Sequence, residues 1–338
     1  MSALPQPRPV SEIEGIDRVR FDSEIRPAGA PVAMRALAGD WQGVKAALQG
    51  DRAICDYLLS CRPTRPVTAL VAPPEVGGRF FYNDRLTGFN FTKHAGRLET
   101  FLGELLRIAG DPAPNGMAVQ SETIPELLPG FVDANPMPLV PASVEPRIWI
   151  GNRIRVAPHF DIKENIAVCL AGRRRFTLFP PGQIANLYPG PFELTPAGTP
   201  VSMVDPTAPD LELYPRFAEA WAGAQQVTLE PGDALYIPYA WWHGVEALEP
   251  VSILVNYWWN EAPPGIAGQY DALLHAIFAF RHLPERERKV WHTMLDHYVF
   301  EASGDPAAHL PEHAQGVLAP ASPRLFASMR HILGQVFR

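Results

Sequence analysis

The sequence is poor in cysteine, with three in 338 residues. Cys55, Cys61 and Cys169 are odd in number and lack paired spacing, which argues against a disulfide framework or a zinc knuckle. No apolar run reaches the roughly 20 residues that a membrane-spanning helix needs. The Pro-rich first 20 residues also lack the apolar centre of a signal peptide. Together these absences predict a cytoplasmic protein with no membrane segment.

Clustered basic residues are also scarce. The formal net charge is −7 and the sequence pI is about 5.8. Proteins that grip a phosphate backbone carry Lys and Arg gathered on one face. The one dense basic run, Arg173 to Arg175, lies within an apolar segment. Nucleic acid is therefore not expected as a partner.

What the sequence has in quantity is turn formers, with 37 prolines and 26 glycines. Between them lie short runs rich in β-branched and aromatic residues, which are typical of strands. The runs are residues 147–150, 153–156, 166–170, 175–179, 226–229, 234–237 and 251–259. Many short strands separated by turns predict a β-barrel or sandwich over about residues 146–260.

Helical spacing flanks this β-rich region on both sides. Residues 1–30 are proline-rich and predict an extended arm, whereas residues 40–59 and 95–108 predict a helical shoulder. Residues 266–282, 285–300 and 324–337 predict a helical tail. A tail that follows a finished barrel has little left to cover. It either forms a self-association surface, making a homodimer, or packs onto its own chain.

A candidate metal site lies in the β-rich region. His159 and Asp161 are two residues apart, so both side chains point to the same face of an extended strand. His243 follows 84 residues later in Trp241-Trp242-His243-Gly244. Two imidazoles and one carboxylate leave open positions on a metal, as in non-haem Fe(II) oxygenases. The alternative for His243 is a core histidine among aromatic residues.

A candidate anion site lies in the run Arg174-Arg175-Phe176-Thr177-Leu178-Phe179. Side chains alternate along a strand, so one of the two arginines points into the barrel. A buried arginine is costly alone but gains a forked, charge-assisted pair with a bound carboxylate. The alternative is a pair with an Asp or Glu of a neighbouring strand.

These residues resemble the cupin-like, JmjC-related 2-oxoglutarate oxygenases, the family that includes the asparaginyl hydroxylase of the hypoxia-inducible factor. The resemblance covers about residues 149–264 and is weak elsewhere. It rests on motifs in a fixed order: His159-Phe-Asp161, Asn165, Gly172 to Pro181, Asn186-Leu-Tyr188, Val204-Asp205, Pro231 to Pro238, Trp241-Trp242-His243 and Asn256-Tyr-Trp258.

The resemblance implies a double-stranded β-helix, or jelly roll, with an N-terminal helical shoulder and a C-terminal helical tail. We expect residues 31–264 to form the catalytic domain and, from the helical spacing of the tail, residues 265–338 to form a helical region that dimerises. His159, Asp161 and His243 match the family's iron ligands. Asn165 and Asn256 match positions that line the co-substrate pocket. Arg174 stands where the family has a lysine that binds the distal carboxylate of 2-oxoglutarate.

The sequence departs from the family in the co-substrate pocket. Arginine and lysine are not interchangeable at a tight site, so Arg174 binds the same carboxylate by a fork, requires a shorter acid or excludes the usual one. Val156 replaces a threonine whose hydroxyl contacts the co-substrate. Gln120 lies in a loosely matched segment and is a weaker candidate for the substrate pocket.

The implied function is a hydroxylase that uses Fe(II), 2-oxoglutarate and molecular oxygen on a side chain of a protein or peptide. Tyr239, Trp241 and Trp258 would wall the substrate pocket, or serve as core filler. One rival is a non-catalytic cupin that binds a metal and a small molecule as a sensor or binding module. Another is an assembly protein built on a degenerate barrel, because fold alone does not decide function.

Overall fold

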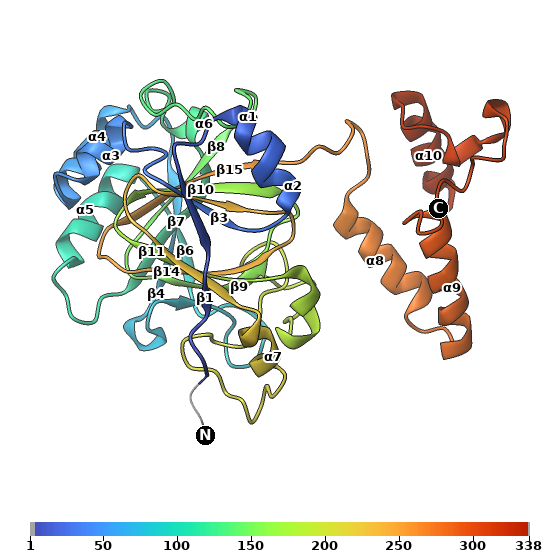
Figure 1. Cartoon of the computed structure of the whole chain (residues 1–338). Helices are drawn as coiled ribbons and strands as arrows, with labels where there is room; N and C mark the ends of the chain where they lie inside the picture. The colour runs from blue at the N-terminus through green and yellow to red at the C-terminus, as the bar shows by residue number, and fades with distance from the viewer. Residues whose placement is uncertain (1–3, 337–338) are drawn as a thin grey trace. The chain divides into compact units, whose positions relative to one another are not determined.

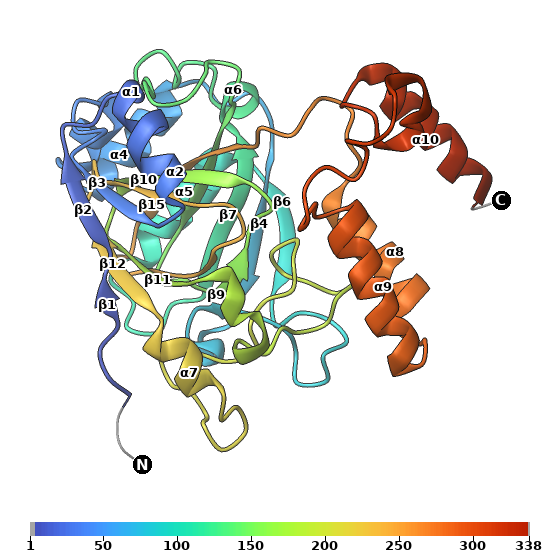
Figure 2. The same cartoon turned by 45° about the vertical axis from the view of Figure 1, so that its right-hand side comes forward.

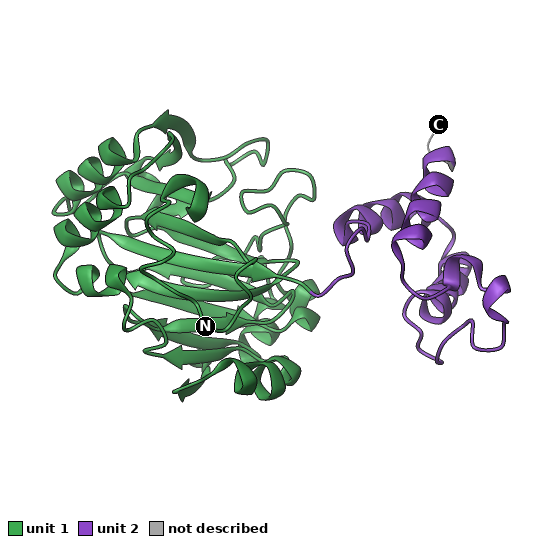
Figure 3. Cartoon of the chain, turned by 90° about the horizontal axis from the view of Figure 1, so that it is seen from above, with its two compact units in different colours: residues 1–260 green, residues 261–338 purple. Residues whose placement is uncertain are grey.

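The computed structural model describes residues 4–336. The chain forms two compact units that divide between Asn260 and Glu261 (Figure 3). Among the described residues, no helix combines the length and the apolar character needed to cross a membrane.

The first unit is built on two mixed β-sheets (Figure 1). One has six strands in the order β1-β12-β11-β14-β9-β5, and the other has nine in the order β2-β3-β13-β10-β15-β8-β7-β4-β6. The strands are β1 Arg8–Pro9, β2 Ser11–Glu14, β3 Val32–Arg35, β4 Val67–Ala72, β5 Arg79–Phe80, β6 Thr92–Gly96, β7 Gly116–Thr123, β8 Pro146–Gly151, β9 Arg155–Phe160, β10 Glu164–Ala171, β11 Arg174–Phe179, β12 Gln225–Leu229, β13 Ala234–Ile237, β14 Trp242–Ala247 and β15 Ser252–Trp259. The predicted fold, a mainly β jelly roll with flanking helices, is confirmed.

Helices cover one face of the nine-stranded sheet (Figure 1). They are α3 Gln42–Ala47, α4 Asp51–Ser60 and α5 Leu98–Ile108. Strand β10 shows how both faces become buried: Ile166 and Val168 pack with the helices, whereas Ala167 and Cys169 pack against the six-stranded sheet. Alternate residues of one strand thus serve two cores, because successive side chains point to opposite faces.

The N-terminal arm is only partly extended. β1 pairs in parallel with β12 and β2 with β3, but residues 18–28 form short helical turns, α1 Arg18–Arg20, η1 Phe21–Ile25 and α2 Arg26–Ala28. The Asp17 side chain accepts a hydrogen bond from the Arg20 N–H, which caps the first turn. The high proline content predicted an extended chain here. The proline of α2 lies in its first turn, where proline is tolerated, and the Asp17 cap stabilises the start of α1, so short helical turns form instead.

Two further short helices complete the first unit around the sheets. α6 spans Ile124–Leu127, and α7 spans Phe217–Ala222. Phe217 of α7 packs with Phe179 of β11 and Trp242 of β14, so α7 closes one end of the six-stranded sheet (Figure 2). The 3-10 turns of this unit are η2 Pro74–Val76 and η3 Pro181–Asn186.

The second unit is helical. Its elements are α8 Gln269–Phe280, α9 Glu285–Tyr298, η4 Glu312–Ala314, η5 Gly316–Leu318 and α10 Pro323–Val336. The bounds of α8, α9 and α10 lie within three residues of the predicted tail helices, except that Phe337 falls outside the described residues. Neither α8 nor α9 contains a buried residue.

Candidate metal centre and cavity

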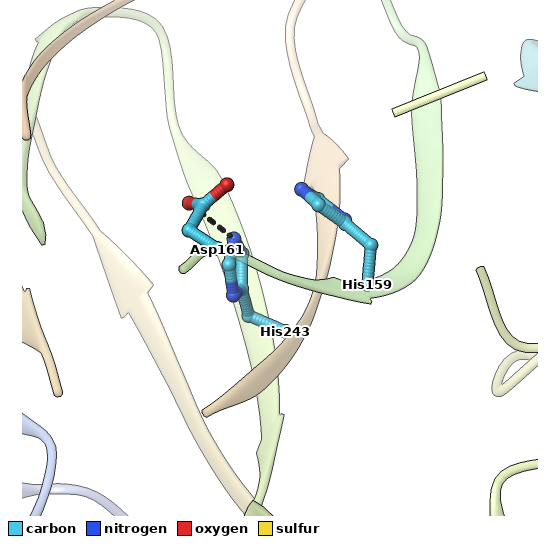
Figure 4. A group of neighbouring side chains, drawn as sticks. All are labelled: His159, Asp161 and His243. Atoms are coloured by element: carbon cyan, nitrogen blue, oxygen red, sulfur yellow. Dashed lines mark ion pairs between the residues drawn. The ribbon is translucent and has the colours of Figure 1, made fainter. Parts of the chain in front are cut away.

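His159, Asp161 and His243 converge where β9 ends and β14 begins, within the six-stranded sheet (Figure 4). His159 lies near the end of β9 and Asp161 just beyond it, while His243 lies on β14 directly opposite His159 in the antiparallel register. One potential ligand atom from each residue lies within 4.8 Å of the other two. His243 Nε2 is 3.6 Å from Asp161 Oδ2. The structure therefore brings the three predicted ligands together.

Backbone carbonyls orient both imidazoles. His159 Nδ1 lies 3.0 Å from the Ala157 oxygen, and His243 Nδ1 lies 3.0 Å from the Trp241 oxygen. A carbonyl oxygen only accepts, so each Nδ1 carries the proton and each Nε2 keeps its lone pair. Burial, with a further contribution from His243, lowers the pKa of His159 to about 4. The ring is neutral at physiological pH, which is the form that binds metals.

A chain of amides holds the carboxylate. Asn165 Nδ2 donates to Asp161 Oδ2 at 3.4 Å, and Asn256 Nδ2 donates to Asn165 Oδ1 at 2.7 Å. The Ala240 N–H donates to the Asp161 carbonyl oxygen at 3.0 Å, which ties the turn before β14 to the end of β9. Such contacts behind a ligand fix its direction and charge. Asn165 and Asn256 thus act on Asp161 as well as facing the cavity.

A cavity of about 490 Å³ opens beside the three side chains. Besides Asp161, its wall includes eight residues that the sequence singled out: Gln120, Val156, His159, Asn165, Arg174, His243, Asn256 and Trp258. Tyr239 and Trp241 do not contribute to this wall. The Tyr239 side chain is exposed, and the Trp241 indole N–H donates to the Gly29 carbonyl at 3.1 Å. The aromatic run before His243 therefore faces the N-terminal arm in part.

Arg174 is the inward arginine of β11. It is 5% exposed and lines the cavity, whereas Arg175 is on the opposite face, 3.6 Å from Glu246. Arg174 forms no ion pair with any Asp or Glu of residues 4–336; its Nε donates instead to Ser252 Oγ at 2.9 Å. Burial lowers its pKa to about 10. The expected alternative, a pair with a carboxylate of a neighbouring strand, is not what the structure shows.

Three buried polar atoms in the cavity wall lack a hydrogen-bond partner among the described residues. They are Trp149 Nε1, Trp258 Nε1 and Asn256 Oδ1. The two indoles meet edge to face, with ring centroids 5.9 Å apart. Buried polar groups are normally satisfied, so an unpaired set on one cavity points to a bound polar ligand.

Several wall residues were not predicted from the sequence. Trp149, Ser121, Lys163 and Thr199 all line the cavity. Ser121 lies in a bulge of β7 with φ of +57°, where the register against β8 shifts. The position of Trp149 in the cavity wall was predictable from strand alternation. Its neighbours Ile148 and Ile150 in the predicted strand are buried on the opposite face, in the core between the nine-stranded sheet and the helices. The bulge and the loop around Thr199 left no periodic signal.

The donor set and the cavity fit an Fe(II) site with an anionic co-substrate. Two imidazoles and one carboxylate are the ligands that a non-haem iron takes on one side, which would leave its other positions free for a co-substrate. A buried arginine without a protein counter-ion lies in the same cavity wall. A carboxylate bound there would satisfy it.

Comparison with known proteins gives a consistent result. A family model described as "Cupin-like domain" matches residues 18–264. HSPB1-associated protein 1 of Homo sapiens is 37% identical over 118 residues, which cover 34% of this chain and 23% of that protein. Lysine-specific demethylase JMJ31 of Arabidopsis thaliana is 31% identical over 133 residues, which cover 39% of this chain and 23% of that protein. For tRNA wybutosine-synthesizing protein 5 of Danio rerio the identity is 31% over 165 residues, which cover 47% of this chain and 45% of that protein. In each case the match spans less than half of the relative's length.

Proposed function

Because the chain belongs to the cupin-like domain family, we propose that it is an Fe(II)- and 2-oxoglutarate-dependent oxygenase. The observation that carries the proposal is the pairing, in one cavity, of three convergent metal-ligand side chains with a buried arginine that has no carboxylate partner. We propose a side chain of a protein or peptide as the group that is hydroxylated. A relative of this chain carries the name of a lysine-specific demethylase.

The metal-ligand side chains and the groups that hold them have distinct roles in this proposal. His159, Asp161 and His243 would hold the iron, which when bound supplies the activation of molecular oxygen. The Ala157 and Trp241 carbonyls keep both imidazoles in the tautomer that leaves Nε2 free. Asn165 keeps the Asp161 carboxylate directed at the site. The chain thus positions the reactants and leaves the difficult chemistry to the metal.

Arg174 would bind the distal carboxylate of the 2-oxo acid. Its guanidinium lies in a wall made largely of apolar side chains, including Phe176, Val245 and Leu254. A charge-assisted pair is stronger in such surroundings than in water. Gln120 and Trp258 lie on the same wall and would contact the substrate or the acid.

A second candidate is a cupin that binds a metal and an acid without turnover, as a sensor. The observation that favours it is Arg174 itself, because an arginine in place of the family's lysine changes the geometry at the acid. Binding would persist in such a protein while the reaction would not.

The decisive experiment measures succinate formed from 2-oxoglutarate by the Fe(II)-loaded protein in air. The oxygenase predicts succinate above a metal-free control, and loss of it in Asp161→Ala and His243→Ala. The matched control is Glu246→Ala, which changes a carboxylate on the outer face of β14. Tight 2-oxoglutarate binding without succinate would support the sensor and overturn the oxygenase.

The partners and compartment follow from other features. The apolar side chains on α8 and α9 are exposed, and we propose that a second copy of the chain covers them as a homodimer. All three cysteines are free thiols, which fits a reducing compartment, so we propose the cytoplasm.

A further inference from the structure

Ser252 contacts Arg174 with both of its oxygen atoms. It is the first residue of β15 and is fully buried. Its Oγ accepts a hydrogen bond from Arg174 Nε at 2.9 Å, and its carbonyl oxygen accepts one from Arg174 Nη2 at 3.3 Å. Ser252 shares a face of β15 with Leu254, Asn256 and Trp258, all of which line the cavity. The serine therefore sits behind the arginine, in line with the cavity wall.

These two contacts use one edge of the guanidinium. The group is planar and has five N–H donors, which form two edges that can each grip a carboxylate. Ser252 occupies the edge made by Nε and Nη2. The remaining N–H of Nη2 and one N–H of Nη1 form the other edge. Within residues 4–336, no hydrogen bond from Nη1 to another residue is found, and the side chain lines the cavity.

We propose that Ser252 is the positioning residue that makes Arg174 bind the distal carboxylate end-on, through its Nη1 and Nη2 atoms. By fixing the plane and depth of the guanidinium, Ser252 sets the chain length of the 2-oxo dicarboxylic acid that spans from the metal to Arg174. The inference rests on the proposed function and adds how the acid is selected.

Ser252 can position the side chain at 174 in this way only if that side chain is an arginine. A lysine ammonium is a compact point charge with no planar edge to fix, so an oxygen at position 252 would matter far less beside a lysine. The prediction is a coupling between the two positions. A serine that only supported the local packing of β15 would have the same effect beside either side chain.

The test is a double-mutant cycle on acid binding, without turnover. Isothermal titration calorimetry of the Mn(II)-loaded full chain measures the Kd of 2-oxoglutarate for the wild type, Ser252→Ala, Arg174→Lys and the double variant. We expect Ser252→Ala to raise the Kd roughly tenfold, as for loss of a hydrogen bond to a charged group. In the Arg174→Lys background the same change should raise it about twofold or less.

Acid length gives a second readout. Oxaloacetate, one carbon shorter, and 2-oxoadipate, one carbon longer, are titrated in the same way. The Kd values of the three acids should differ more in the wild type than in Ser252→Ala, because the Arg174 guanidinium can tilt once the Ser252 hydroxyl is removed. Ser252→Cys keeps a side chain of similar volume but replaces the hydroxyl with a weaker acceptor. Its discrimination between the three acids should therefore lie between those of the wild type and Ser252→Ala. It also replaces the alanine variant if that one fails to fold.

Equal effects of Ser252→Ala in both backgrounds, or an unchanged preference for acid length, would overturn the inference even if the protein forms succinate. Conversely, strong coupling in a protein that forms no succinate would leave this inference standing and remove the oxygenase. The two claims therefore fail separately.

Discussion

At the scale of single residues, the largely apolar cavity wall contains three residues with a buried polar atom that the protein leaves unpaired. A buried donor or acceptor without a partner costs about 1 to 3 kcal/mol. Trp149, Trp258 and Asn256 each leave such an atom in the wall beside Arg174. The folded chain carries this cost in a single cavity, which is expected of a site that a polar ligand completes.

Replacing Trp149 with phenylalanine tests this reading. Trp149→Phe removes an indole N–H that bonds to no described residue, so it should change the free energy of unfolding by about 1 kcal/mol or less while weakening 2-oxoglutarate or substrate binding. Trp241→Phe is the matched control, because its N–H donates to Gly29 outside the cavity wall. That variant should lose stability and keep ligand affinity. The opposite pattern in urea unfolding and calorimetry would show that the Trp149 N–H serves no ligand.

Asn165 provides a second test at this scale. Asn165→Ala removes the amide that donates to the Asp161 carboxylate and accepts from Asn256. Loss of a contact behind a metal ligand typically lowers affinity roughly 10- to 100-fold. We expect that loss for Fe(II) or Mn(II) in a competition titration. Asn186→Ala, a part-buried asparagine on η3 outside the cavity wall, should leave metal affinity unchanged.

At the scale of the element, neighbouring residues of β11 point to opposite faces: Arg174 lines the cavity and Arg175 lies next to Glu246 on the outer face. Arg174→Thr should abolish acid binding, because it removes the buried guanidinium that faces the cavity. Arg175→Thr removes the outward arginine next to Glu246 and should cost roughly 0.2 to 1 kcal/mol of stability, as for other exposed ion pairs. Calorimetry with 2-oxoglutarate distinguishes the two. Equal loss in both variants would mean that the strand alternation does not decide binding.

The same alternation explains how much could be predicted from the sequence. It indicated that one of the two arginines faces the interior, and the period-two runs located most central strands, with β13 at its observed bounds. β14 was not predicted as a strand, because Trp242 to Val245 are all buried and the strand has no polar alternation. His243 therefore fell outside the predicted strands, whereas it lies on β14 opposite His159.

The turn before β14 explains why Tyr239 and Trp241 lie outside the cavity wall. Ala240 has φ of +58°, a conformation that non-glycine residues adopt rarely, and its N–H bonds to the Asp161 carbonyl. This turn directs Tyr239 outward and brings Trp241 to the N-terminal arm. Only long-range contacts impose such a turn, so local sequence does not reveal it. The positions of Lys163 and Thr199 in the wall depend on loops in the same way.

At the scale of the whole molecule, the second unit is a set of helices without a buried apolar face. α8 exposes Leu273, Leu274 and Phe278, and α9 exposes Val290 and Met294. Apolar side chains this exposed on neighbouring helices of the chain favour an interaction site. A second copy of the chain is always available at equal concentration, and a two-fold axis lets one patch cover its own copy.

Phe278 is the natural place to test this, since its side chain is 80% exposed. Phe278→Glu would place a charge within the proposed interface and should convert a dimer to a monomer, as measured by light scattering coupled to size exclusion at about 10 μM protein, where interfaces of sub-micromolar affinity stay closed. Leu213→Glu is the control, because it introduces the same charge at an exposed leucine of the first unit. It should leave the mass unchanged. If the wild-type protein is monomeric at that concentration, a second copy of the chain is not the partner of these helices. If Phe278→Glu binds the acid as tightly as the wild type does, the cavity of the barrel is complete without a second copy.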